Sequence, residues 1–373
     1  MNWHGKCYIE WYMSKIIFYK VGNGDTCLIK TNAGKKLLFD FCQASDENLS
    51  EKIKNDIDWT DRTPNELDVL AITHLDKDHI CDSQSVFYFN HATKYQSHDR
   101  IKFKTLWIPA AVIVECGTQI CDDSWVIRAE ARYRLREGKG VRIFGRPESI
   151  KNWLEENKID IESVRHLFTG AGQLVSGLSL ETDKFEVFVH SPFYEKEDDG
   201  DVDRNTETLI VSIKFKEHQN CSTNLLMLAD ADSDLLHKIV GITEAAKNTD
   251  RLKWDIMKIA HHCSYKALNK AEKGKNETIP VENVEKLMKY ANPRAVMVAS
   301  CKEVEKDSDQ PPHHQAYATY KKFCDLNGHQ IKLTADGDER IIIDVGRYGC
   351  ALDCNDEVDA MKVMTSSMAP RVG

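Results

Sequence analysis

Short apolar runs of strand length, separated by turn residues, occupy the first eighty positions of the chain. A β-branched run at 16–21 ends at the turn residues 22–25, and two further runs follow at 26–30 and 36–41. Apolar runs bounded by Gly, Asn and Asp are typical of consecutive strands. Leu67–Ile72 is almost continuously apolar, as expected of a strand that is covered on both faces. The pattern therefore predicts four strands before residue 73.

The hydrophobic pattern is weaker between residues 80 and 180 and sharpens again afterwards. In this middle segment it predicts a strand at 105–109 and helices at 125–138 and 147–157. After residue 184 it predicts helices at 234–239, 280–290 and 315–327, and strands at 185–190, 207–215, 224–229, 254–260, 295–300, 331–334 and 341–345.

Strands thus gather towards both ends of the chain, with helices between and after them. Two mixed sheets that face each other, with helices on the outside, accommodate this order, so we predict an α/β fold of the four-layer αββα sandwich type. No internal repeat or low-complexity linker divides the chain. We expect one domain over residues 1–350, with about 80–180 as a divergent insertion or lid. Residues 351–373 are expected to form a C-terminal tail that frays.

Composition is that of an ordinary globular protein. The 373 residues are 42% hydrophobic and 29% charged, which is enough for one large α/β domain or two smaller ones. No apolar run is long enough to cross a bilayer, and the N-terminus lacks the pattern of a signal peptide. The twelve cysteines include no Cys-x-x-Cys pair. We therefore expect reduced thiols, a cytoplasmic location and no membrane partner.

The charge balance bears on nucleic-acid binding. The net charge is −9, from 59 acidic and 50 basic residues, which gives no support to nonspecific binding of long duplexes. The basic stretch 128–139 is most simply the solvated side of a helix, and the alternative is a surface for a phosphate-bearing substrate. Single-strand binding would combine local aromatic and basic residues, although core packing is the favoured role of those aromatics. The residues concerned are Trp107, Trp125 and Tyr133 with Arg128, Arg132 and Arg134.

A dense group of metal-binding side chains directly follows the strand at 67–72. His74, Asp76, Asp78 and His79 lie within six residues. Imidazole nitrogens and carboxylate oxygens together suit one or two borderline-to-hard divalent cations, such as zinc, manganese or iron. A charged, solvated turn is the alternative interpretation. The solvated turn is disfavoured because other predicted strands also end at metal-binding side chains.

Four further predicted strands end at, or are soon followed by, residues of metal-binding or catalytic type. These residues are His190, Asp230, the pair His261 and His262, and the pair His313 and His314. Side chains gathered at one end of a sheet are what an open α/β site uses, because the strands are rigid and the loops adaptable. A lone histidine such as His190 is more often a satisfied core or edge residue. The series of strand ends, taken together, predicts a metal site.

The order of these motifs resembles that of the metallo-β-lactamase fold hydrolases, and within them the ComEC-like group related to the hydrolase domain of a DNA-uptake competence protein. The segment His74–His79 is similar to the superfamily's His-x-His-x-Asp-His, and His261–Ser264 is similar to the group's His-His-Gly-Ser. Further similar segments are Val21–Thr26, Leu38–Phe41, Asn205–Ile210, Leu228–Asp230 and Pro312–His314. The resemblance runs from about residue 16 to residue 345.

The resemblance implies a centre with two divalent metal ions, zinc or manganese. It would assign His74 and Asp76 to one metal, Asp78 and His79 to the other, and Asp230 as a bridge between them. His261 would complete the site, and His262 would be either a ligand or a support for one. His190 is the only candidate near the family's third motif, and its assignment is open.

Two close cations would share a hydroxide nucleophile and would polarise a phosphoryl or carbonyl oxygen. In the same comparison Asp78 belongs to the catalytic set, His313 or His314 would protonate a leaving group or bind an oxyanion, and Ser264 would position a phosphate.

The sequence also departs from the family pattern at several positions. Asp76 occupies the place of the second histidine, which makes that site more oxygen-rich and shifts the expected metal towards manganese or iron. Cys263 stands where the family has Gly, and Ala229 also replaces a Gly. None of these changes removes an obligatory ligand.

The leading functional hypothesis is a metal-dependent hydrolase of phosphodiesters, a nuclease or phosphodiesterase whose substrate is a nucleic acid or nucleotide. The alternatives are hydrolysis of a cyclic or small nucleotide or another phosphoester, and a binding or regulatory module that keeps the fold without turnover. In the second case, residues 80–180 would form the docking surface for a protein partner.

Overall fold

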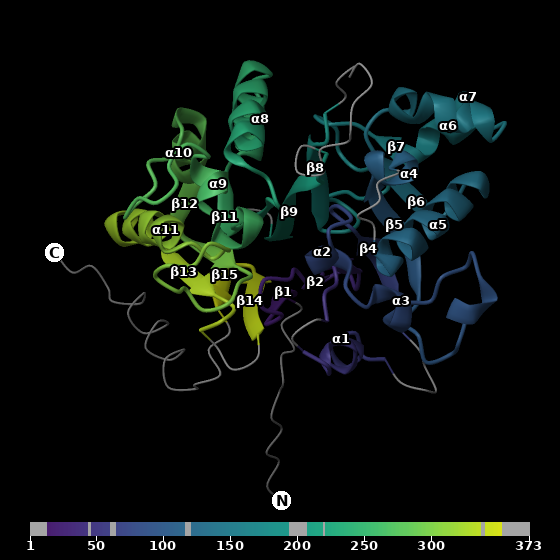
Figure 1. The fold of residues 1–373 in the computed structure, drawn as a ribbon, viewed down its shortest axis with the longest axis horizontal. Helices are drawn as coiled ribbons and strands as arrows, with labels where there is room; N and C mark the ends of the chain where they lie inside the picture. The colour runs from purple at the N-terminus through teal and green to yellow at the C-terminus, as the bar shows by residue number, and fades with distance from the viewer. Residues whose placement is uncertain are drawn as a thin grey trace, which may run out of the picture.

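Two β-sheets face each other, and helices cover the outer side of each sheet (Figure 1). The computed structural model describes residues 13–43, 46–59, 65–115, 121–193, 207–218, 221–336 and 340–352. Over these residues the predicted four-layer α/β sandwich is confirmed.

The first sheet has nine strands in the described part of the chain, in the order β15-β14-β1-β2-β3-β4-β5-β6-β7. The strands from β3 to β7 run parallel, whereas β1 pairs antiparallel with β2 and β14. Their bounds are β1 Ser14–Tyr19, β2 Cys27–Lys30, β3 Lys36–Phe39, β4 Leu67–Ala71, β5 Phe103–Pro109, β6 Val141–Phe144, β7 Phe168–Thr169, β14 Arg340–Gly346 and β15 Gly349–Leu352.

The second sheet has six strands over the same residues, in the order β13-β12-β11-β10-β9-β8. The strands from β10 to β13 run parallel, and β9 pairs antiparallel with both β8 and β10. Their bounds are β8 Phe185–Ser191, β9 Ile210–His218, β10 Cys221–Met227, β11 Trp254–Lys258, β12 Ala291–Ala299 and β13 Gln330–Leu333.

Helices from the first half of the chain pack on the first sheet, and helices from the second half pack on the second sheet (Figure 1). The first set comprises α1 Leu49–Asp56, α2 Lys77–Ile80, α3 Ser83–Val86, α4 Ala111–Val114, α5 Asp122–Arg136, α6 Lys151–Glu156 and α7 Ile161–Val164. The second set comprises α8 Ser233–Ala245, α9 Tyr265–Leu268, α10 Glu282–Lys289 and α11 His314–Asn327. Short 3₁₀ turns occupy Thr93–Tyr95, Pro147–Ile150, Arg165–Leu167, Thr249–Arg251 and Ala260–Cys263.

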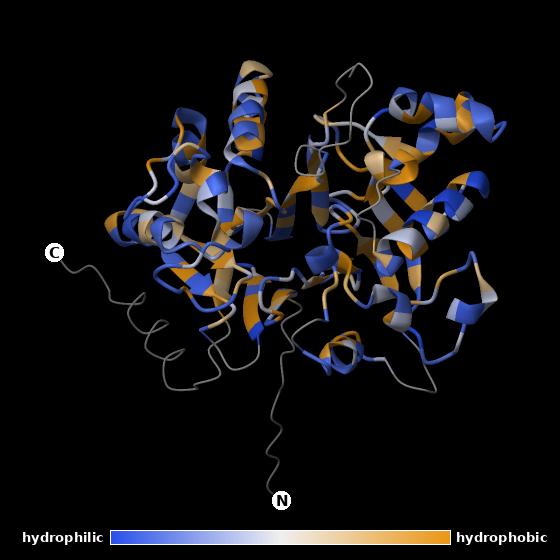
Figure 2. Ribbon diagram, in the orientation of Figure 1, coloured by the Kyte–Doolittle hydropathy of each residue, from blue (hydrophilic) through white to orange (hydrophobic). Residues whose placement is uncertain are grey.

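Three apolar cores separate the layers, and strand alternation assigns residues to them. In β1, Ile16 and Phe18 face the core between the sheets, whereas Ile17 and Tyr19 face the core under the helices. Successive side chains of a strand point to opposite faces, so a strand buried on both sides is apolar at nearly every position. Figure 2 shows this as orange strands in the interior and more polar surfaces on the outer helices.

The segment predicted as an insertion or lid belongs to the body of the fold. It contributes β5, β6 and β7, which extend the first sheet, and helices that pack on it. The sequence pattern missed β6 and β7 because β6 has four residues and β7 has two, too few to show a period. The predicted tail begins two residues early, since β15 extends to Leu352, and the remainder lies outside the described residues.

None of the helices in the described residues combines the length and apolar character needed to cross a membrane.

Candidate metal centre

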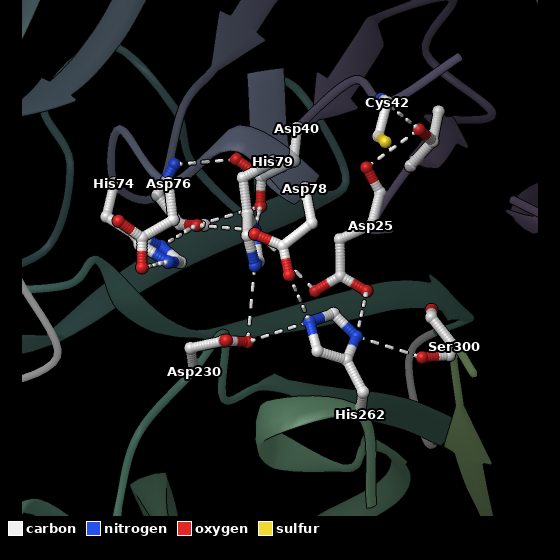
Figure 3. Close-up of polar contacts among 12 residues, drawn as sticks. Asp25, Asp40, Cys42, His74, Asp76, Asp78, His79, Asp230, His262 and Ser300 are labelled. Carbon is white, nitrogen blue, oxygen red and sulfur yellow. Dashed lines mark hydrogen bonds and ion pairs between the residues drawn. The ribbon is translucent and has the colours of Figure 1, made fainter. Parts of the chain in front are cut away.

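The candidate centre lies where the carboxyl ends of strands from both sheets meet. The loop after β4 carries His74 and Asp76, and the short helix α2 that follows carries Asp78 and His79. Asp230 follows β10, and His262 follows β11. Figure 3 shows these side chains converging from the two sheets. The carboxyl ends of parallel strands are the usual place for a ligand site in α/β proteins, because backbone pairing ends there and the loops are free to be shaped.

Two imidazole rings form the floor of the centre, and each is held from behind at Nδ1. His79 Nδ1 lies 2.9 Å from Asp40 Oδ2, and His262 Nδ1 lies 3.0 Å from the carbonyl oxygen of Ser300. Both rings are almost completely buried. A histidine held at Nδ1 presents Nε2 as its ligand atom, which is the usual arrangement at metal sites.

Both Nε2 atoms face the carboxylate of Asp230. Asp230 Oδ1 lies 3.2 Å from His79 Nε2 and 3.5 Å from His262 Nε2. Asp78 Oδ2 lies 3.2 Å from His262 Nε2. Figure 3 shows dashed lines from the Asp230 carboxylate to both rings. We refer to Asp78, His79, Asp230 and His262 as the inner group.

A second, more open set of side chains adjoins the inner group. His74 is buried, and its Nε2 lies 3.6 Å from Asp76 Oδ2. The rings of His74 and His79 are 4.0 Å apart between centroids. Asp76 has a side chain that is 35% exposed, so this pair, which we call the outer pair, faces solvent more than the floor does.

Asp40 organises the loop after β4. Its carboxylate accepts hydrogen bonds from the backbone N of Thr73 at 2.7 Å and from the Thr73 hydroxyl at 2.8 Å, in addition to its contact with His79. The Thr73 hydroxyl in turn lies 3.0 Å from His74 Nδ1. A single carboxylate thus sets the orientation of His79 directly and that of His74 through Thr73.

The turn after β11 directs His262 inwards by an unusual backbone path. His261, His262 and Cys263 have φ values of 50°, 51° and 66°, which lie in the left-handed region. Such conformations are strained for residues other than Gly and persist where the surroundings enforce them. Here the backbone N of His261 donates to the carbonyl of Ala229 at 2.9 Å, and the backbone N of His313 donates to the carbonyl of Cys263 at 3.1 Å.

The inner group is strongly coupled electrostatically. Burial would lower the pKa of His262, but Asp230 and the neighbouring carboxylates outweigh it and raise that pKa to about 10. The pKa of His79 is also raised, because Asp230 and Asp40 overcome its burial. Burial would raise the pKa of Asp78, but its close contact with His262 and the charge of His79 lower it to about 2. The metal-free centre therefore holds protonated imidazoles against ionised carboxylates.

His74 differs from the two floor histidines. Burial, together with the nearby charge of His79, lowers its pKa to about 4. It is therefore neutral at physiological pH, and its Nε2 lone pair is available to a cation without loss of a proton.

The unpartnered atoms of the centre fit a divalent cation. His74 Nε2, His79 Nε2, His262 Nε2 and Asp230 Oδ1 are buried and make no well-aligned hydrogen bond in the described structure, although each lies within ion-pair distance of another group of the centre. Buried polar atoms without partners cost stability, so their concentration at one point calls for a ligand. Imidazole nitrogens with carboxylate oxygens suit zinc, manganese or iron. Asp25, His79, Asp230 and His262 also offer ligand atoms within 4.8 Å of one another.

His190, predicted as a candidate ligand, lies elsewhere. Its neighbours Val187 and Val189 face the core between the sheets, so alternation points His190 to the opposite, outer face of β8. There its Nε2 lies 3.2 Å from the carbonyl oxygen of Arg251, and its ring packs against Phe188. The structure therefore removes His190 from the ligand set.

The structure also separates the roles of His261 and His262. His262, and not His261, lies among the inner carboxylates, because the left-handed turn directs the second histidine inwards. The His261 ring is 6.3 Å from that of His262 between centroids, and its Nδ1 is buried without a hydrogen-bond partner. His261 thus lies beside the centre and outside the group of ligand atoms that come within 4.8 Å of one another.

The three residues predicted to handle substrate have different surroundings. His313 is buried, packs against Tyr265 and leaves Nδ1 unpartnered. His314 is exposed at the first position of α11. Ser264 is buried, and its hydroxyl caps α9 by accepting from the backbone N of Lys266 at 3.3 Å, so it is not presented to a substrate.

Sequence reasoning missed Asp25 and Asp40 as parts of the site. Both stand in segments that were compared with family motifs, but neither was given a role. The signal for Asp25 was the preceding Gly24: a Cβ at that position would lie 2.6 Å from the Cys42 side chain and 3.1 Å from the Asp78 carbonyl oxygen. A glycine needed for such close approach indicates that the turn packs against the metal-binding loop.

Comparisons with known proteins add little to this geometry. No protein-family model matches the sequence. No curated protein matches it either. Among solved structures, the chain is similar to a protein of Parabacteroides distasonis whose description as a metal-dependent hydrolase is itself provisional. The two chains share 8% sequence identity and a TM-score of 0.36, over 86% of this chain and 94% of that one. Similarity at this level carries no argument about function, so the functional conclusion depends on the site.

Proposed function

We propose that this protein is a metal-dependent hydrolase that cleaves phosphodiesters, a nuclease or phosphodiesterase of the metallo-β-lactamase fold and ComEC-like type. The observation that carries the proposal is the convergence of three buried imidazole Nε2 atoms on three carboxylates, those of the half-exposed Asp76 and Asp78 and of the buried Asp230. The order of the motifs along the chain supports the family assignment, and the arrangement of strand ends is compatible with it.

The residues divide into two metal positions of unequal strength. The inner group would hold the first ion, since it offers two imidazole nitrogens and the carboxylates of Asp78 and Asp230. The outer pair, His74 and Asp76, would hold a second ion with Asp230 between the two. We expect the inner position to bind more tightly because it has more ligands and is more deeply buried.

A divalent ion at this centre supplies an acidified water and a Lewis acid for the phosphoryl oxygens. The residues of the chain supply the geometry. Asp40 and the Ser300 carbonyl hold the two floor rings so that both Nε2 atoms face the same point. Asp78, with a side chain that is 43% exposed, lies at the boundary between the floor and solvent, where a substrate would enter.

A phosphodiester is the substrate class that the motif resemblance favours, and the net charge of −9 favours a small or single-stranded substrate over a long duplex. His313 is the side chain proposed to handle the leaving group. Burial lowers the pKa of His313, so the ring is neutral at physiological pH and would first take a proton from the attacking water before giving it to the leaving group.

The experiment that tests the proposal begins with metal content. The purified full chain is analysed for bound metals and then assayed with manganese, magnesium and zinc. The substrates are single-stranded DNA, RNA, duplex DNA, cyclic dinucleotides and bis-para-nitrophenyl phosphate. We expect turnover that depends on metal and that falls strongly in Asp78→Ala.

A matched control is Asp68→Ala, which removes a carboxylate from β4 at the opposite end of the same strand, where it pairs with Lys104. Turnover in this variant should remain close to that of the unmodified protein. Absence of turnover on every substrate, with metal bound, would leave a binding or regulatory module as the better description. Absence of bound metal in every preparation would refute the centre itself.

A further inference from the structure

A buried ion pair lies directly behind the metal-binding histidines. Lys258 is the last residue of β11 and is 2% exposed, and its Nζ contacts Asp25 Oδ2 in the turn between β1 and β2. Asp25 is 5% exposed. Lysine is almost never this deeply buried unless it is paired, and the pairing must offset a large cost of desolvation. A buried ion pair that is costly to desolvate and that lies against the metal-binding histidines is expected to serve the site.

The ion pair connects the two halves of the centre. Asp25 belongs to the first sheet, and its backbone N donates to the carbonyl of Asp78 in the metal-binding loop at 3.0 Å. Lys258 belongs to the second sheet and precedes His262 by only four residues. The pair therefore spans the boundary between the sheets at the point where their ligands must meet.

Asp25 also approaches both floor histidines from the side that a metal would not occupy. Its Oδ2 lies 3.8 Å from His79 Nδ1, and its Oδ1 lies 3.9 Å from His262 Nδ1. The Nε2 atoms of the same rings face Asp230 and Asp78 instead. Figure 3 shows that Asp25 contacts one ring nitrogen of His262, whereas Asp230 and Asp78 contact the other. Asp25 is thus placed to support the ligands, although its oxygens are close enough to be counted among candidate ligands.

Lys258 has a second effect through its charge. Asp25, Asp40, Asp78 and Asp230 place four carboxylates around the two floor rings. The protonated rings offset part of this negative charge in the metal-free protein, and Lys258 adds a permanent positive charge beside Asp25 at the boundary between the sheets. The ammonium group neutralises Asp25 in both the metal-free and the metal-bound protein.

We propose that Asp25 and Lys258 are positioning residues, which hold the metal-binding loops of the two sheets in register and orient His79 and His262 from behind. This inference rests on the proposed function, because it takes a divalent ion to bind on the Nε2 side of the two rings. It adds a pair of residues to which none of the sequence motifs assigned a role.

The test uses three variants of the full chain: Asp25→Asn, Lys258→Met and the double variant. Affinity for Mn²⁺ is measured by calorimetric titration, the visible spectrum of the Co²⁺-loaded protein reports ligand geometry, and thermal unfolding of the metal-free protein reports stability. Each single variant leaves one buried charge unpaired, so we expect a lower unfolding midpoint. We also expect an affinity about ten- to a hundred-fold lower, the range typical of residues that support metal ligands.

The double variant separates positioning from simple stability. It leaves no unpaired charge, so the unfolding midpoint should recover most of what the single variants lose. Its Mn²⁺ affinity should remain at least about ten-fold below that of the unmodified protein, with an altered Co²⁺ spectrum. The matched control is Glu130→Gln, which breaks the buried pair of Glu130 with Arg134 inside α5. That variant should lower the midpoint and leave metal affinity unchanged.

Two results would overturn the positioning role of Asp25 and Lys258 and leave the proposed function standing. A double variant with unmodified affinity and spectrum would show that the pair has only a structural role. Complete loss of Mn²⁺ binding in Asp25→Asn, equal to the loss in His262→Ala, would show that Asp25 is itself a ligand. An unmodified protein that binds no divalent metal would instead refute the proposed function, and this inference with it.

Discussion

The two sheets contribute to the metal centre in different ways. The second sheet provides Asp230 and His262, whose side chains are only 6% and 2% exposed and are surrounded by fixed neighbours. The first sheet provides His79 at the same depth, but also Asp76 and Asp78, whose side chains are 35% and 43% exposed. The second sheet thus supplies only deeply buried groups, whereas the first sheet supplies one buried ring of the floor and two carboxylates with room to adjust to an ion and a substrate.

Two neighbouring histidines also differ in their surroundings. His261 and His262 follow β11 in succession, yet their pKa values shift in opposite directions. Burial lowers the pKa of His261, whereas the carboxylates of the inner group overcome burial and raise that of His262 to about 10. The position of a ring relative to Asp230 and Asp78 decides its role, and the residue type does not.

The strongest test of this comparison is to remove each of these histidines in turn. We expect His262→Ala to lose inner-site metal and to lower turnover of bis-para-nitrophenyl phosphate by about a thousand-fold, because a catalytic metal contributes about 4 kcal/mol or more to transition-state stabilisation. His261→Ala should retain its metal, as measured by elemental analysis. Equal metal loss in the two variants would contradict the distinction.

The next test concerns the difference between the inner group and the outer pair. We expect the unmodified protein to bind two metal ions with different affinities in a calorimetric titration. His74→Ala should remove the weaker phase, keep the tighter one and reduce turnover by about a hundred-fold, since one stabilising group is lost while the floor remains. A variant that loses both phases would show that the two positions are not separable.

A smaller effect is expected from changing Asp40, which holds the His79 ring of the floor in place. Asp40→Asn keeps the shape of the side chain and tolerates the φ of 54° at this position, because Asn readily adopts left-handed conformations. It weakens the contact that orients His79, so metal affinity should fall by about ten- to a hundred-fold. Asp68→Asn is the control on the neighbouring strand. If Asp40→Asn binds metal as tightly as that control, orientation by Asp40 is unimportant.

The last test of the comparison concerns pH dependence. In the metal-free protein, the pKa of His262 lies near 10, above its ordinary 6.5, so a metal must displace a proton. Affinity should therefore rise with pH by about ten-fold per unit for each proton displaced, and level off near pH 10. Titrations in buffers of different ionisation enthalpy measure the released protons. An affinity independent of pH between 6.5 and 9 would contradict the protonation of His262.

The same raised pKa sets the stability of the metal-free protein. The protonated His262 ring stabilises the folded protein fully below pH 6.5, because the ring is then charged in both the folded and the unfolded chain and the folded chain surrounds it with carboxylates. This stabilisation is lost as the pH rises from 6.5 to about 10. Thermal unfolding with a chelator present measures this loss, and His262→Ala should reduce it.

Much of the fold was predictable from local patterns, because strands buried on both faces leave continuous apolar runs. The runs at 67–72, 185–190 and 254–260 correspond to β4, β8 and β11 with differences of one or two residues at their ends. The segment from 80 to 180 was harder to interpret. Its strands β6 and β7 are short, and its remaining helices, apart from α5 and α6, are single turns whose pairing depends on the sheet beside them.

The sequence by itself determined which residue types occupy the strand ends, and so the chemistry that the centre can perform. Only the tertiary structure decided which of them meet. Alternation along β8 places His190 on the outer face of the sheet. The left-handed turn after β11 directs His262, and not His261, towards the carboxylates of the centre. The pairing of Asp25 with Lys258 joins residues that are 233 positions apart. Contacts across that separation depend on the packing of two sheets, which no local pattern of residues encodes.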